Sequence, residues 1–177
     1  MKTLANAKDK AEIVQRLEAI GPVSRRRWGK MTVAEMVCHL SDAFRVAMSE
    51  KTAKPVSNLF TRSMMKWAAL RLRFQWPHGF STVPECEAGV GGTTPSEMER
   101  DLRELRELLE RFSKQPRRFG FAEHPIFGKL SDAEWLRWGY LHTDHHLRQF
   151  GVYGRARRPI FNASSTMSAA CSSPSIC

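Results

Sequence analysis

The chain has 177 residues, a formal net charge of +10 and a sequence pI near 10.0. This length fits one domain with a sizeable core, and no apolar run is long enough to cross a membrane as a helix. The N-terminus lacks the apolar region of a signal peptide and the four cysteines form no C-x-x-C pattern, so we expect a cytoplasmic protein without a disulfide framework.

The excess of basic residues raises the question of nucleic-acid binding. Short basic groups occur at residues 25–27, 117–118 and 155–158, but they form no interleaved basic and aromatic motif. We therefore expect a solvated basic surface and no specific nucleic-acid site, with weak nonspecific binding at low salt.

The first half of the chain predicts two regular helices. Apolar residues at helical spacing predict the first over residues 7–20, which Gly21 ends. Thr32 and Glu35 form a capping box that begins the second, which we extend to Glu50.

The middle of the chain is less regular. We predict a basic, amphipathic third helix over residues 57–74; binding to a membrane surface is one interpretation of such a helix, and packing on the other helices is the more frequent one. A long loop follows over residues 76–92, where we expect His78 and Cys86 to be exposed. The core-facing side of the third helix would consist of Phe60, Met64, Trp67 and Leu70.

Two more capping boxes mark the later helices. Thr94 and Glu97 predict the start of a fourth helix, and Ser131 and Glu134 predict the start of the last. No stretch alternates as a strand would, so the fold class is all-α. We expect a single domain over residues 1–158, followed by a disordered, Ser- and Ala-rich tail over residues 159–177.

The last helix carries two histidines one turn apart. On a helical wheel from Trp135, the later positions on the aromatic, inward side fall within a sector of roughly 80°. An unpaired buried imidazole costs about 1–3 kcal/mol, and a metal ion would serve both histidines at once. A hydrogen-bonded pair of core histidines is the alternative. The residues in this sector are Trp138, His142, His146, Gln149 and Tyr153.

A third histidine lies on the second predicted helix. His39 is at the edge of that helix's apolar face, where it can look into a groove between helices. Asp42 follows three residues later and could orient it; an ordinary boundary histidine paired with Asp42 is the alternative.

The segments MTVAEMVCHLSDAF, HPIFGKLSDAEW and HTDHHLRQF together resemble the DinB-like superfamily, and within it a branch of unknown function. The resemblance covers roughly residues 7–154 and implies a four-helix bundle, here with an extra short helix and long loops. It also implies a metal site whose ligands are His39, His142 and His146.

The resemblance implies a chemistry as well. Three protein ligands leave a coordination position open, and imidazoles suit Zn, Ni or Fe. Relatives include thiol-dependent transferases and metal-dependent hydrolases, so the expected activity is thiol (S-)transfer or hydrolysis on a small-molecule substrate, with a low-molecular-weight thiol as cosubstrate. Asp42, Trp138, Gln149 and Tyr153 would line the pocket or support the ligands.

Two other functions stay open at this point: a non-catalytic, stress-related or binding bundle, and a basic protein associated with nucleic acid. The family resemblance also implies a homodimer, formed through the third or the last helix.

Overall fold

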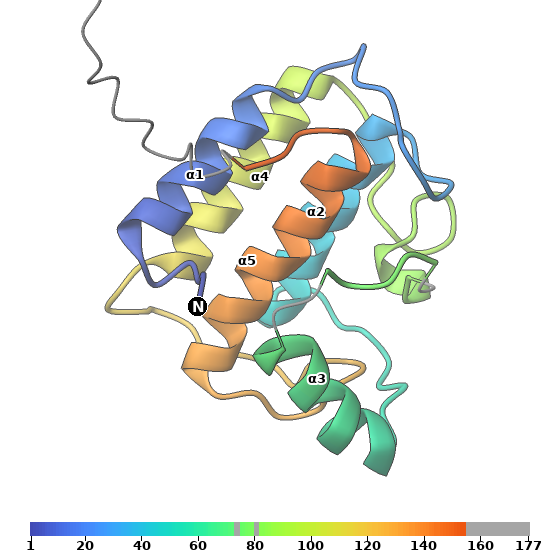
Figure 1. Cartoon of the computed structure of the whole chain (residues 1–177). Helices are drawn as coiled ribbons and strands as arrows, with labels where there is room; N and C mark the ends of the chain where they lie inside the picture. The colour runs from blue at the N-terminus through green and yellow to red at the C-terminus, as the bar shows by residue number, and fades with distance from the viewer. Residues whose placement is uncertain (73–74, 80–81, 155–177) are drawn as a thin grey trace, which may run out of the picture.

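The computed structural model describes residues 1–72, 75–79 and 82–154, and within these residues the chain is predominantly helical (Figure 1). No strand occurs in this part of the chain, where two isolated β-bridges are the only β pairing, so the all-α prediction is confirmed. A π-helical turn, η1 (Thr61–Met65), leads directly into α3, and a 3-10 turn, η2 (Pro84–Cys86), lies in the loop that follows. The α-helices are α1 (Ala7–Glu18), α2 (Val33–Ala47), α3 (Lys66–Arg71), α4 (Met98–Ser113) and α5 (Asp132–Gln149).

Local capping explains where two of the helices begin. Thr32 and Glu35 form the predicted capping box at α2, and Ser131 and Glu134 form the one at α5. The box predicted at residues 94–97 is wrong, since no side chain caps α4. The backbone N–H and hydroxyl of Ser96 donate instead to Asp101, at 2.9 and 2.6 Å.

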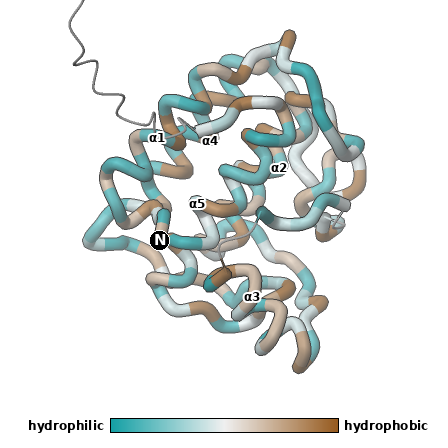
Figure 2. The backbone as a smooth tube through the Cα atoms, viewed as in Figure 1, coloured by the Kyte–Doolittle hydropathy of each residue, from teal (hydrophilic) through white to brown (hydrophobic). Residues whose placement is uncertain are grey.

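The core lies where α2 packs on α4 and α5, and α1 on α5 (Figure 1). Apolar and polar stretches alternate along each of these helices, as Figure 2 shows, so each can bury one side. Phe44 and Phe112 meet at 4.8 Å between ring centroids, and Trp135 is also fully buried. Gly139 lets Phe112 approach α5, since a Cβ there would lie 2.7 Å from the Phe112 ring.

The predicted orientation of the third helix is wrong. Leu70 is buried, but Phe60, Met64 and Trp67 are 59%, 67% and 59% exposed. The element contacts the rest of the protein through Lys66, which pairs with Glu134 at 3.9 Å, and through its C-terminal end, where Arg137 of α5 donates from Nε to the Leu70 carbonyl at 2.6 Å. In Figure 1 it lies at the lower end of the molecule, beside the start of α5. Residues 73–74 of the predicted helix lie outside the described residues.

The last helix ends earlier than the wheel assumed. α5 stops at Gln149, and Gly151 has a φ of 75°, a left-handed conformation that turns the chain away. Tyr153 is therefore not on the inward face, and it is 58% exposed. The predicted tail and the domain boundary at residue 158 lie outside the described residues. Among the helices that the structure describes, none has both the length and the apolar character needed to span a membrane.

Candidate metal centre

Three imidazoles converge between α2 and α5. The Nε2 atoms of His39 and His142 are 3.1 Å apart. The ring of His146 lies 4.7 Å from that of His39 and 4.9 Å from that of His142, between centroids. One ring nitrogen from each histidine lies within 4.8 Å of the others, a spacing at which all three could bind one ion. His39 and His146 are buried, and His142 is half-buried.

The tautomer of His39 follows from its partner. Its Nδ1 lies 3.1 Å from the backbone carbonyl of Cys86, in η2. A carbonyl oxygen can only accept, so Nδ1 carries the proton and Nε2 keeps its lone pair. That lone pair points toward His142, into the cluster.

His146 is fixed in the same way through an amide. Its Nδ1 lies 2.8 Å from Gln149 Oε1, and Gln149 Nε2 donates to the Trp28 carbonyl at 3.0 Å. Because the Trp28 carbonyl can only accept, the amide must turn its NH2 group there and its oxygen toward His146. His146 therefore donates from Nδ1 and keeps the lone pair of Nε2. Ligating histidines are commonly held by a donated N–H in this manner.

Burial keeps the cluster neutral. It lowers the pKa of His39 below the ordinary value, and it lowers the pKa of His146 and His142 much further. Neighbouring imidazoles add to the effect at His142. Neutral imidazole is the form that binds a metal, so the site is prepared to accept a cation near neutral pH.

Aromatic rings surround His142. Trp138 stacks on it at 4.7 Å and 29° and is itself buried, so this predicted pocket residue lies against the His142 ring. Trp76 lies 6.2 Å from the same ring. These rings restrict water at the half-buried histidine.

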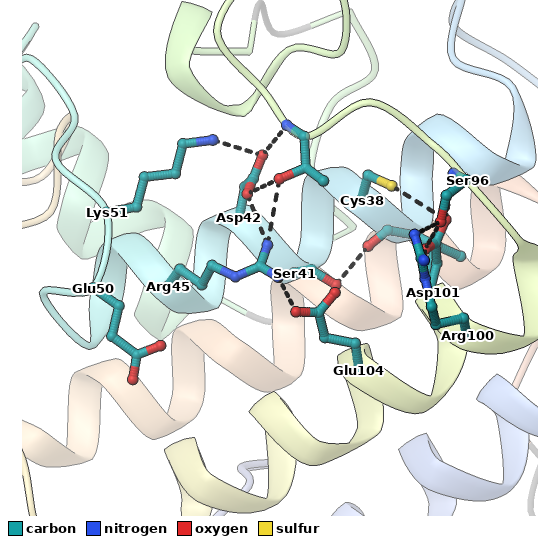
Figure 3. A network of polar contacts seen from close by, with 12 residues as sticks. Cys38, Ser41, Asp42, Arg45, Glu50, Lys51, Ser96, Arg100, Asp101 and Glu104 are labelled. Atoms are coloured by element: carbon teal, nitrogen blue, oxygen red, sulfur yellow. Dashed lines mark hydrogen bonds and ion pairs between the residues drawn. The ribbon is translucent and has the colours of Figure 1, made fainter.

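Asp42 does not hydrogen-bond His39, as its spacing on the helix had suggested it could. Its carboxylate accepts from the Thr93 backbone N–H at 2.6 Å and the Thr93 hydroxyl at 2.7 Å, and it pairs with Lys51 and Arg45 at 2.9 and 3.0 Å. Figure 3 shows its carboxylate between these two cations. Burial alone would raise its pKa, but the Lys51 and Thr93 hydrogen bonds hold the pKa below the usual range. Asp42 thus ties the segment that follows η2, and not His39 itself, to α2.

The supporting groups that sequence reasoning missed are backbone carbonyls. Cys86, expected to be exposed, is buried, and burial raises the pKa of its thiol to about 12. Neither Cys86 nor Trp28 had a signal that could have found it, since every residue type carries a carbonyl.

His124 is a structural histidine. It is buried in the loop before α5, where its Nδ1 accepts from the backbone N–H groups of Ile126 and Phe127 at 3.1 Å each. Burial lowers its pKa to about 3. It lies outside the group of three that could hold an ion.

A cavity of about 610 Å³ opens near α5, but none of the three clustered histidines lines it. Its walls include Trp28 and His78, which stack at 4.0 Å and 12°, together with Trp76 and His145. Burial and the neighbouring His78 lower the pKa of His145 to about 4. Trp76, one of the lining residues, lies 6.2 Å from His145 and equally far from His142, between ring centroids.

One comparison with known proteins gives a match. The model of a family described as "Protein of unknown function (DUF1569)" matches residues 3–152, which contain every helix described above. No curated protein and no solved structure matches the chain.

Proposed function

The chain belongs to the DUF1569 family, and we propose that it is a metalloprotein of DinB-like, four-helix architecture. His39, His142 and His146 would bind one divalent transition metal ion, such as Zn, Ni or Fe. The single observation that carries this proposal is the orientation of His39 and His146, which both donate from Nδ1 to fixed oxygens and turn Nε2 toward the same space.

A core that only needed to satisfy its histidines would not require this arrangement. The Nε2 atom of His39 lies 3.1 Å from His142 Nε2, and among the described residues His146 has a hydrogen-bond partner at Nδ1 only. The proton of His142 can satisfy one of the two Nε2 lone pairs and leaves the other without a donor. A cation at this position would satisfy every lone pair together.

We further propose that the activity is metal-dependent thiol (S-)transfer or hydrolysis. A metal held by three imidazoles supplies a Lewis acid with an open coordination position. The cavity lined by Trp76, whose ring lies 6.2 Å from that of His142, would admit the small-molecule substrate and a low-molecular-weight thiol. Trp76 and Trp138 would exclude bulk water there, and Gln149 would hold the proton on His146 Nδ1.

Elemental analysis of the untagged protein tests the metal site. We expect near-stoichiometric transition metal, and its loss in both His39→Ala and His142→Ala. His124→Asn is the matched control, since it replaces a buried histidine outside the cluster and should keep the metal. A protein without metal, which also takes up no added Zn or Ni, would refute the proposal.

Turnover is tested separately, with a panel of thiols and electrophiles. Activity that disappears with the metal in His142→Ala would support transfer or hydrolysis. A metal-loaded protein that is inactive on the panel would favour the other function, a non-catalytic binding or stress-related protein.

A further inference from the structure

One long segment of this chain is cationic and contains no acidic residue. Residues 51–84 contain six lysines and arginines and no aspartate or glutamate, so this segment accounts for more than half of the net charge of +10. It includes η1 and α3. The six cations are Lys51, Lys54, Arg62, Lys66, Arg71 and Arg73.

The same segment exposes a row of large apolar side chains, which we call the outer row: Leu59, Phe60, Met64 and Trp67. Their exposed fractions are 88%, 59%, 67% and 59%. Phe60, Met64 and Trp67 are spaced by four and three residues, so they share one side of the element, and Leu59 directly precedes Phe60. Scattered exposed apolar residues are ordinary, but a contiguous row on one element marks a surface that binds something.

Two exposed arginines of this segment form no close ion pair, although Arg71 helps to lower the pKa of Glu134. Arg62 and Arg71 are exposed and form no ion pair with any described carboxylate. The Arg62 guanidinium is instead hydrogen-bonded to the Ser57 hydroxyl at 3.0 Å. Both charges are therefore available to an anionic partner.

We propose that the outer row is a docking surface for an anionic lipid membrane. Leu59, Phe60, Met64 and Trp67 would enter the boundary between headgroups and acyl chains, and Arg62 and Arg71 would meet the headgroup phosphates. This binding is peripheral and independent of the proposed metal chemistry.

The combination of charge and apolar surface selects this partner. A nucleic acid could pair its phosphates with the arginines, but it would offer no apolar environment to Leu59 and Phe60. A second copy of the chain, as the predicted homodimer would provide, could cover the apolar side chains. It would also bring the same acid-free, cationic segment against itself, which costs free energy. An anionic membrane satisfies both features at once.

Cosedimentation of the full chain with vesicles tests the proposal. We expect binding to phosphatidylcholine mixed with phosphatidylglycerol, little binding to phosphatidylcholine alone, and weaker binding as salt is raised. The Arg62→Gln/Arg71→Gln variant should bind about thirty-fold more weakly, from about 1 kcal/mol for each cation. Its matched control is Arg25→Gln/Arg103→Gln, which removes the same charge from exposed positions outside residues 51–84 and should bind nearly as well as the parent.

The apolar contribution has its own variant and probe. Phe60→Ser/Met64→Ser should lose vesicle binding while its metal content and melting temperature stay unchanged, because both side chains are exposed. Trp67 is the exposed one of the five tryptophans, so its emission should shift to the blue on anionic vesicles. Trp67→Phe should abolish the shift and keep the sedimentation.

Three results would overturn the proposal. The first is equal binding to neutral and anionic vesicles. The second is binding that falls as much in the Arg25→Gln/Arg103→Gln control as in the Arg62→Gln/Arg71→Gln variant. The third is a dimer in sedimentation equilibrium that Phe60→Ser/Met64→Ser converts to monomer, without vesicle binding by either; this would assign the row to a second copy. None of these results bears on metal content, so failure here is distinguishable from failure of the metal site.

Discussion

His124 should make the folded protein sensitive to acid, and the asparagine variant should remove that part of the sensitivity. The pKa of His124 is about 3 in the folded chain, because burial disfavours the charged ring. Protonation of Nδ1 would also displace the backbone N–H groups of Ile126 and Phe127. In the unfolded chain the pKa returns to about 6.5.

The sign follows from which state binds the proton. Below a pH of about 6.5 the unfolded chain protonates His124 and the folded chain does not, until the pH approaches the folded pKa. The free energy of unfolding therefore falls as the pH is lowered, by about 1.4 kcal/mol per pH unit from this one site. Between pH of about 6.5 and about 5 the site accounts for roughly 2 kcal/mol, and above that window it contributes no pH dependence.

The His124→Asn variant isolates this contribution. The Asn carbonyl oxygen can accept the same backbone N–H groups but does not titrate. Lost stacking on Phe127, now 4.6 Å away, lowers stability by an amount independent of pH. Urea unfolding of chelator-treated protein, at a series of pH values, gives the slope of the unfolding free energy against pH for the parent and for the variant. Other buried histidines share the direction of the effect, so only the difference between the slopes is diagnostic. Equal slopes in the parent and the variant would refute the reasoning.

Three further predictions concern the site's supports and the core. Gln149→Leu removes the acceptor of the His146 Nδ1 proton, and we expect metal affinity to fall roughly 10–100-fold in a chelator competition while the helical circular dichroism is kept; unchanged affinity would contradict the supporting role. Asp42→Asn removes the charge that holds Lys51 and the loop, and the Thr93 amide should exchange its hydrogen faster, whereas equal exchange would show that the loop is held elsewhere. Gly139→Ala adds a Cβ that would lie 2.7 Å from the Phe112 ring, and overpacking should cost about 1–3 kcal/mol in thermal unfolding; an unshifted melting temperature would mean that the ring can move away.

Features that depend on a few neighbouring residues could be predicted from the sequence. The capping boxes at Thr32 and Ser131 need only a side chain and a backbone N–H three residues apart. The pair His142 and His146 shares a face through helical geometry alone. His39 came from the edge of an apolar stripe and from the family resemblance, and the structure places it against that pair.

Features that depend on a partner distant in the chain could not be predicted from the sequence. Trp67 and Met64 have the spacing of core residues, but periodicity identifies an apolar face and not what covers it. Extending the wheel to Tyr153 assumed a helix that Gly151 interrupts. The acceptor for His39 is a backbone carbonyl of Cys86, 47 residues away in the chain, and carbonyls leave no trace in composition or spacing.

The supports of the histidine cluster show why helix packing alone does not define the site. Two helices supply the three imidazoles. The proton on His39 is held by the Cys86 carbonyl, and the proton on His146 by Gln149, whose amide is oriented by the Trp28 carbonyl. Cys86 and Trp28 both lie outside the long helices. If the loop carrying Cys86 or the loop carrying Trp28 moved away, the Nδ1–H of His39 or of His146 would lose the contact that holds it. The imidazole could then change tautomer, and its Nε2 would become a donor at the centre of the cluster. In the proposed metal site, the free energy of holding these loops would be part of the free energy of binding a cation, and changes at Asp42 should reach the site through the loop.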